Sequence, residues 1–187
     1  MKTLVIGYGN ALRSDDGVGP LVADRVAYWN LPDVRSLSVH QLAPELATEI
    51  AQAEIVFFVD ACVERSQASL EPIEAEEATS RLDHLWSPSV LLYLAKTLYD
   101  ADPVAYEILI PATQFEYGET LSAITCEGAD WAIAKLAAVL RPNSVRIGET
   151  QIAANLIEST FHQSRTAAIR SPPERSSIDK TSSPHHW

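Results

Sequence analysis

Cysteine and basic side chains are scarce in this 187-residue chain, and each shortage excludes a class of protein. The two cysteines, Cys62 and Cys126, are too few for a disulfide framework or a four-thiolate zinc site. The 14 Lys and Arg residues stand against 25 Asp and Glu, which leaves a net charge of −11. Because nucleic-acid binding needs clustered cations that neutralise phosphates, we expect no nucleic-acid partner.

Long hydrophobic runs are also missing. No apolar stretch approaches the roughly 18 residues of a membrane-spanning helix. The chain also does not open with the basic and then apolar pattern of a signal peptide. These absences predict a protein of the cytoplasm with no membrane partner.

The composition is that of one globular domain followed by a polar tail. With 47% hydrophobic residues, the chain can bury one sizeable core, which we expect over residues 1–164 with its essential part at 1–141. Residues 151–163 are a candidate for one further helix. From 165 to 187 the chain holds five Ser, three Pro and four Lys or Arg. Such a segment has too little apolar surface to offset its ordering entropy, so the tail is predicted to be disordered.

Short apolar runs alternate with helical periodicity along most of the sequence. The run IVFFV at 55–59 is apolar throughout, as expected for a strand buried on both faces of a parallel sheet. The alternation predicts an α/β protein with a central, mostly parallel, twisted sheet of about five strands. The predicted strands are 4–6, 36–39, 55–59, 69–74 and 104–110, and the predicted helices are 18–29, 44–52, 88–98 and 129–141.

The loop after the first predicted strand carries two carboxylates and one cation. It reads GYGNALRSDDGVG at 7–19 and leads directly into the first predicted helix. Folds of this class bind ligands at the carboxyl ends of their strands. A phosphate site needs bare amides and positive charge, and Leu12 stands where a dinucleotide-binding motif has its third glycine. The loop therefore favours a cation or a polarised amide bond over a nucleotide.

Asp16 in this loop and Asp60 at the end of the third predicted strand are expected to line one crevice. The first and third strands of such sheets are usually neighbours. Two adjacent carboxylates repel unless a cation or a shared proton lies between them. His84, which precedes the helix start at Ser87, adds an imidazole. This set of two oxygen ligands and one nitrogen ligand suits nickel or zinc better than magnesium.

Each candidate also has a purely structural interpretation. Asp15 and Asp16 would then cap the first helix and complement its dipole. Asp60 would accept hydrogen bonds from loop amides, and His84 would be a surface histidine.

Three further side chains lie close to these in the predicted fold. His40 and Gln41 follow the second predicted strand, and they either line the same crevice or bond within their own loop. Cys62 is a candidate nucleophile with His84 as its base, although a small, buried and inert thiol is the simpler interpretation.

Four segments together resemble a hydrogenase maturation endopeptidase, in the branch that processes cytoplasmic bidirectional [NiFe] hydrogenases. They are GYGNALRSDDGVG at 7–19, HQLAPEL at 40–46, VDA at 59–61 and FEYGETLS at 115–122. The first segment is specific and the others support it. The resemblance spans residues 1–141 and does not include the tail.

The resemblance implies a three-layer α/β/α sandwich of the phosphorylase/hydrolase-like kind and an endopeptidase of the aspartic-type class. Members of the family trim a short C-terminal peptide from the hydrogenase large-subunit precursor once nickel has been inserted. The precursor is therefore the expected transient partner, and nickel is expected to arrive with it rather than to be held permanently. The enzyme is expected to work as a monomer. A non-catalytic nickel-recognition chaperone for the same precursor is the alternative.

Position by position, the metal-contacting acidic residues of the family fall on Asp16 and Asp60, which are also the expected catalytic groups. The first is often Glu in relatives, so Asp16 is the shorter variant. In some members the histidine directly follows a Ser-Pro pair, where this chain has Ser89. His84 is therefore taken as its functional equivalent and as the third metal contact. The expected substrate-contacting residues are Asn10, His40 and Gln41.

Overall fold

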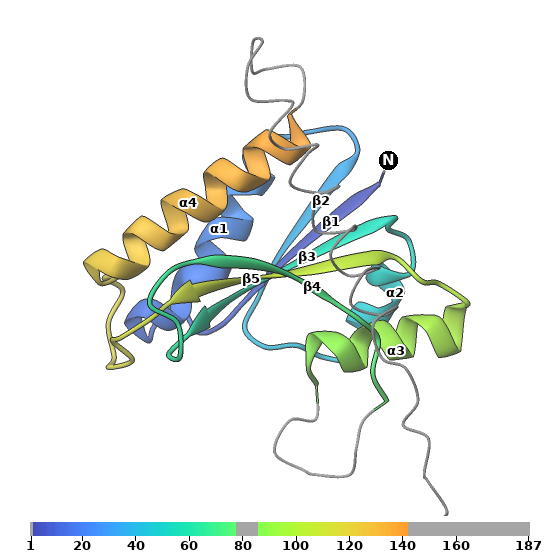
Figure 1. The fold of residues 1–187 in the computed structure, drawn as a ribbon, viewed down its shortest axis with the longest axis horizontal. Coiled ribbons are helices and arrows are strands. Elements are labelled where there is room, and N and C mark those ends of the chain that lie inside the picture. Colours follow the sequence, from blue (N-terminus) through green and yellow to red (C-terminus); the bar gives the residue numbers. More distant parts are fainter. Residues whose placement is uncertain (1, 78–85, 142–187) are drawn as a thin grey trace, which may run out of the picture. The chain divides into compact units, whose positions relative to one another are not determined.

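A five-stranded sheet runs through the computed structural model, which describes residues 2–77 and 86–141 (Figure 1). Its strands lie in the order β2-β1-β3-β5-β4, and among them β4 alone runs antiparallel to its neighbour. The predicted α/β class, the mostly parallel sheet and the pairing of the first strand with the third are confirmed. The strands are β1 (Thr3–Tyr8), β2 (Val34–Val39), β3 (Ile55–Cys62), β4 (Ser69–Ile73) and β5 (Val104–Pro111).

Helices cover both faces of this sheet (Figure 1). One face carries α1 (Val18–Ala27) and α4 (Ala123–Leu140), and the other carries α2 (Leu46–Ile50) and α3 (Pro88–Tyr99). The predicted three-layer sandwich is confirmed. Within residues 2–77 and 86–141, no helix combines the length and the apolar character needed to span a membrane. The helix predicted at 151–163 and the tail at 165–187 lie outside the described residues.

Neighbouring residues of one strand contribute to two separate cores, because successive side chains of a β-strand point to opposite faces. In β3, Val56 and Phe58 join the core under α2 and α3, whereas Phe57 and Val59 join the core under α1 and α4. Each of the four is at most 3% exposed. The apolar run at 55–59 therefore reflects burial on both faces of the sheet.

The local sequence pattern predicted the start of one helix correctly and the start of another wrongly. The start of α3 is as predicted, since Ser87 Oγ accepts a hydrogen bond from the N–H of Val90 at 3.3 Å and Pro88 occupies the first turn. In contrast, α4 begins at Ala123, well before the predicted 129. Its second turn carries Gly128, where a Cβ would lie 2.7 Å from the side chain of Ile110, so a large apolar residue cannot occupy this position.

Two glycines allow α1 to lie directly against the strands that lead into the first loop. A Cβ on Gly19 would press against the carbonyl oxygens of Tyr8 in β1 and Val59 in β3. A Cβ on Gly7 would overlap the backbone of Gly19. The contact is therefore backbone to backbone, and it determines where α1 starts relative to the ends of β1 and β3.

We predict that Gly19→Ala lowers the free energy of unfolding by about 2–3 kcal/mol, because the added methyl group meets main-chain atoms that cannot turn away. Urea unfolding of the purified protein measures the change. Gly118→Ala is the matched control, because a Cβ there meets only the Ser14 hydroxyl, at 3.0 Å. A Gly19→Ala variant as stable as the control would show that α1 does not pack this closely.

Candidate active site

Two carboxylates from separate parts of the chain meet at the carboxyl ends of β1 and β3. Asp60 lies near the end of β3, and Asp16 lies in the short 3-10 helix η1 (Ser14–Gly17) between β1 and α1. They are close enough for the charge of Asp16 to contribute to raising the pKa of Asp60. The structure thus brings together the two acidic residues singled out in the sequence, at the strand ends where this class of fold binds ligands.

The loop before η1 folds back on itself and orients the Asp16 side chain. Asp16 Oδ2 accepts a hydrogen bond from the backbone N–H of Asn10 at 3.0 Å. Asn10 Oδ1 in turn accepts one from the N–H of Leu12 at 2.9 Å. Gly9 has a φ of +134°, and a Cβ there would overlap the backbone of Asp16. The Asn10 side chain is therefore engaged within the loop, and its contact with substrate stays a prediction.

Asp60 is a partly buried carboxyl group with two hydrogen-bond partners beside it. Its Oδ1 accepts from the N–H of Ala61 at 2.8 Å, and the Tyr8 hydroxyl is its second partner. Burial raises the pKa of Asp60 to about 6, the carboxylates of Glu107 and Asp16 add to the rise, and the two hydrogen bonds oppose it. A carboxyl with such a pKa exchanges protons near neutral pH, as general acid–base catalysis requires.

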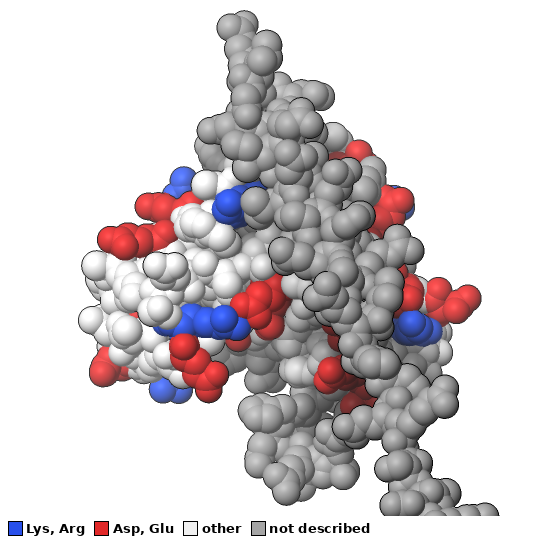
Figure 2. Space-filling view, in the orientation of Figure 1, with Lys and Arg blue, Asp and Glu red and all other residues white. Residues whose placement is uncertain are grey.

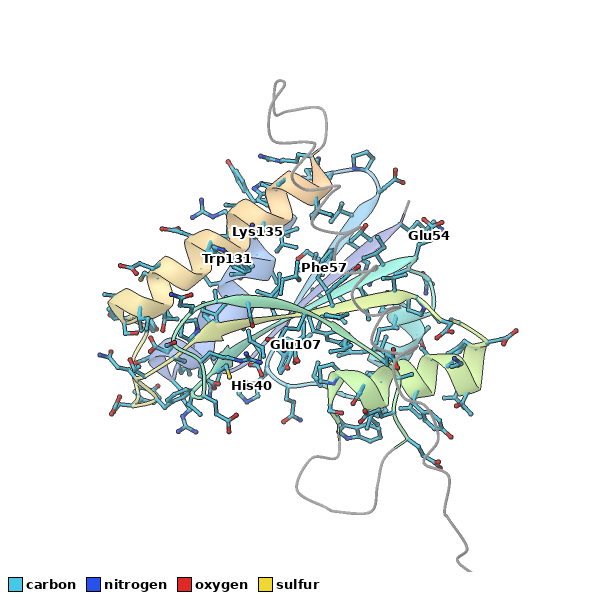
Figure 3. The ribbon with its side chains drawn as sticks, in the orientation of Figure 1. His40, Glu54, Phe57, Glu107, Trp131 and Lys135 are labelled. Atoms are coloured by element: carbon cyan, nitrogen blue, oxygen red, sulfur yellow. The ribbon has the colours of Figure 1, made fainter. Side chains whose placement is uncertain are left out.

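Tyr8 and Glu107 belong to the same cluster, and the sequence reasoning missed both. The Tyr8 hydroxyl donates to Glu107 Oε1 at 3.3 Å. Burial, the largest cause, raises the pKa of each, and the charge of Glu107 also raises that of Tyr8. The available signal was a single acidic residue within the otherwise apolar run of β5. Figure 3 shows Glu107 on the same side of the sheet as His40.

Asp15 does not cap the first helix, which was one interpretation of its position in the sequence. The N-cap of α1 is Gly17, which makes no side-chain cap hydrogen bond. The Asp15 side chain is instead fully buried and accepts hydrogen bonds from the N–H groups of Thr113, Gln114 and Ser122 and from the Ser122 hydroxyl, at 2.6–2.9 Å. All of these donors lie in the loop between β5 and α4.

Backbone contacts join these two loops along their length. The N–H of Ser14 donates to Gly118 O at 2.8 Å, and the N–H of Gly118 donates to Leu12 O at 2.9 Å. The loop that carries Asp16 is therefore held against residues 112–122, a segment that the sequence reasoning used only as part of the resemblance.

For the other candidate site residues, the structure gives a position but no contact that assigns a role, or it does not describe the residue. His40 and Gln41 are exposed and directly follow β2, whose last residue Val39 pairs with Tyr8 at the same end of the sheet. Cys62 is a partly buried free thiol at the end of β3. His84 lies outside the described residues, so its role as third ligand stays a prediction.

Negative charge dominates the electrostatics of the chain. Acidic side chains outnumber basic ones on the face seen in Figure 2, as the net charge of −11 implies. Within residues 2–77 and 86–141, no three His, Cys, Asp or Glu side chains form a group that could hold a metal ion. The described part of the site therefore consists of the carboxyl groups of Asp16 and Asp60, together with Tyr8 and Glu107.

We predict that Asp15→Asn destabilises the protein by about 2–4 kcal/mol, because an amide NH2 group would face donors that now have an acceptor. Burial alone would raise the pKa of Asp15, but the hydrogen bonds from Ser122, Thr113 and Gln114 outweigh it and lower the pKa to about 2. The wild-type protein should therefore lose about 2 kcal/mol as the pH falls from about 4 to 2, and the variant should lack this dependence. Urea unfolding at several pH values measures both effects, with the exposed Asp24→Asn as control. Equal stability of the two variants would contradict the assigned role.

We predict the opposite effect for Asp60→Asn. The raised pKa of Asp60 means that the folded state holds its proton more tightly than the unfolded state does. Its contribution is therefore most favourable below about pH 4 and is lost as the pH rises to about 6, at a cost of about 2–3 kcal/mol. At pH 8 the Asn variant should be more stable than wild type by up to this amount. Asp102→Asn, at an exposed ion pair with Lys96, should change stability by less than about 0.5 kcal/mol. A less stable Asp60→Asn variant at pH 8 would contradict this account.

Solved structures share this fold, whereas no family model matches the sequence and no curated protein matches it by sequence. The [NiFe] hydrogenase maturation protease HycI from Thermococcus kodakarensis KOD1 has a TM-score of 0.61 at 22% identity, covering 75% of this chain and 92% of its own. The hydrogenase 2 maturation peptidase from a Thaumarchaeota archaeon has a TM-score of 0.55 at 22% identity, covering 75% and 99%. The hydrogenase maturating endopeptidase HybD from E. coli has a TM-score of 0.53 at 21% identity, covering 77% and 94%. The chain therefore has the fold of these hydrogenase maturation proteases.

Proposed function

We propose that this protein is an endopeptidase that removes a C-terminal peptide from the nickel-loaded large-subunit precursor of a [NiFe] hydrogenase. The observation that carries the proposal is the meeting of Asp16 and Asp60 at one edge of the sheet, in a fold shared with proteins named as hydrogenase maturation proteases. The sequence resemblance adds the bidirectional branch of these enzymes. The enzyme is further proposed to be a cytoplasmic monomer that binds its precursor transiently.

The metal in this proposal belongs to the substrate. Two carboxylates, together with the imidazole proposed for His84, form a set suited to a borderline ion such as nickel. Such a set leaves coordination positions for the cysteine thiolates of the precursor. Asp16 and Asp60 would then recognise precursor that already carries nickel, and the metal would mark the chain as ready for trimming.

The hydrolytic step needs a group that accepts a proton from water as the water attacks the scissile carbonyl. Asp16 is the proposed general base, since its carboxylate is partly exposed and its orientation is set by the N–H of Asn10. Asp60, further into the strand end, would contact the metal and stabilise the bound geometry. Assignment of the enzyme to the aspartic type follows from these two roles.

Mass spectrometry of the precursor after incubation with the purified protein tests this function. Nickel-loaded precursor should lose the mass of a C-terminal peptide, and nickel-free precursor should keep its mass. An unchanged mass for the loaded precursor, with a stable complex between the two proteins, would identify a chaperone instead.

Asp16→Asn should lower the trimming rate at least about 100-fold, because loss of a general base typically costs 10²–10⁴ in rate. The variant should remain folded, since an Asn oxygen can still accept the hydrogen bond from the N–H of Asn10. Asp24→Asn, an exposed change of the same chemistry on α1, is the matched control and should trim normally. Normal trimming by Asp16→Asn would refute its assignment.

A further inference from the structure

The Tyr8 hydroxyl lies near two carboxyl groups. It donates to Glu107 Oε1 at 3.3 Å and also lies within hydrogen-bonding reach of Asp60, and its single proton serves one of the two carboxylates at a time. These three residues come from three adjacent strands, β1, β3 and β5.

Strand register explains why they meet. Ile6 lies opposite Phe58, and Phe58 lies opposite Glu107, so these three positions share one face of the sheet. Side chains two residues apart in a strand point to the same face. Tyr8 and Asp60, each two residues further along, therefore project on the face that Glu107 occupies.

The contacts of Asp60 leave its carboxyl little freedom. Its Oδ1 is held by the adjacent N–H of Ala61 at 2.8 Å. The Tyr8 hydroxyl provides a second contact that is independent of that local turn. Together they restrict the orientation of the carboxyl group.

Glu107 has no role in the proposed hydrolysis, yet a partly buried carboxyl in a sheet is costly without a partner. The charge of Arg65 favours the ionised form of Glu107, but the ion pair of Arg65 is with Glu71, at 2.7 Å. Glu71 lies opposite Glu107 on β4. The hydrogen bond from Tyr8 is therefore the side-chain hydrogen bond that Glu107 makes among the described residues, and it holds the tyrosine hydroxyl across β3, the strand that carries Asp60.

We propose that Tyr8 is a positioning residue for Asp60 and that Glu107 anchors Tyr8 in the orientation this requires. The consequence for trimming rests on the proposed function. The effect on the Asp60 carboxyl is a property of the folded chain alone.

Tyr8→Phe tests the first part, because it removes one hydroxyl and keeps the ring. We expect kcat for trimming of nickel-loaded precursor to fall about tenfold, the factor that corresponds to about 1.4 kcal/mol. The melting temperature should stay within about 2–3 °C of the wild-type value, the shift that corresponds to about 1 kcal/mol in a domain of this size. Tyr106→Phe is the matched control. Tyr106 is buried in the opposite core, where it stacks on Phe57 with ring centroids 5.5 Å apart. Equal losses of kcat in the two variants would overturn the proposal.

Glu107 variants test the anchor. Glu107→Leu should lower kcat in the wild-type background and cause a smaller loss in a Tyr8→Phe background, because part of the effect of Glu107 passes through the tyrosine hydroxyl and part through its charge near Asp60. Glu107→Gln, which retains a hydrogen-bonding side chain, should recover most of the activity lost in Glu107→Leu. Additive losses in the double variant, or no recovery with Gln, would show that Glu107 does not act through Tyr8.

A measurement without precursor separates this proposal from the proposed function. In protein labelled with ¹³C-aspartate, the carboxyl resonance of Asp60, assigned by its loss in Asp60→Asn, should move in Tyr8→Phe and stay in place in Tyr106→Phe. If wild type trims no precursor but the resonance moves, the function fails and the positioning role stands. If wild type trims and the resonance does not move, the positioning role fails and the function stands.

Discussion

The carboxylate of Asp15 lies fully buried where two loops meet, and the geometry of the candidate site depends on it. A buried carboxylate is tolerated only when hydrogen-bond donors surround it, and here three backbone N–H groups and the hydroxyl of Ser122 do so. The loop after β1 cannot move independently of the loop before α4 while these bonds persist. Asp16, the next residue along the chain, takes its place at the strand ends from this constraint.

The glycines of the first loop and helix serve the same end by a different means. At Gly7 and Gly19 the absence of a Cβ brings α1 against the backbone of β1 and β3. The short connection between β1 and α1 is thereby fixed at both ends, by close packing at the helix and by hydrogen bonds at the loop. Rigid support of this kind holds Asp16 and Asp60 at the same edge of the sheet, although their charges repel.

Stability and chemistry oppose each other in the acidic cluster. Asp15 stabilises the folded state in its ionised form, whereas burial makes ionised Asp60 and Glu107 unfavourable. A protein under selection for stability alone would replace such groups with apolar side chains. Their presence at the carboxyl edge of the sheet is therefore not explained by stability, and ionisable groups with shifted pKa values are frequent at functional sites.

The sequence by itself determined the α/β class, the mostly parallel sheet and the neighbouring positions of β1 and β3, because these follow from local periodicity and from general rules of strand order, and the family resemblance added the three layers. It also marked Asp16 and Asp60 as candidates. It singled out Asp16 rather than Asp15, but it gave Asp15 only the role of a helix cap, since Asp15 turns toward donors 98 or more residues away. The pairing of Tyr8 with Glu107, 99 residues apart, was hidden for the same reason. Only the tertiary structure decided these contacts, because strand order and loop packing bring such residues together and no local pattern records them.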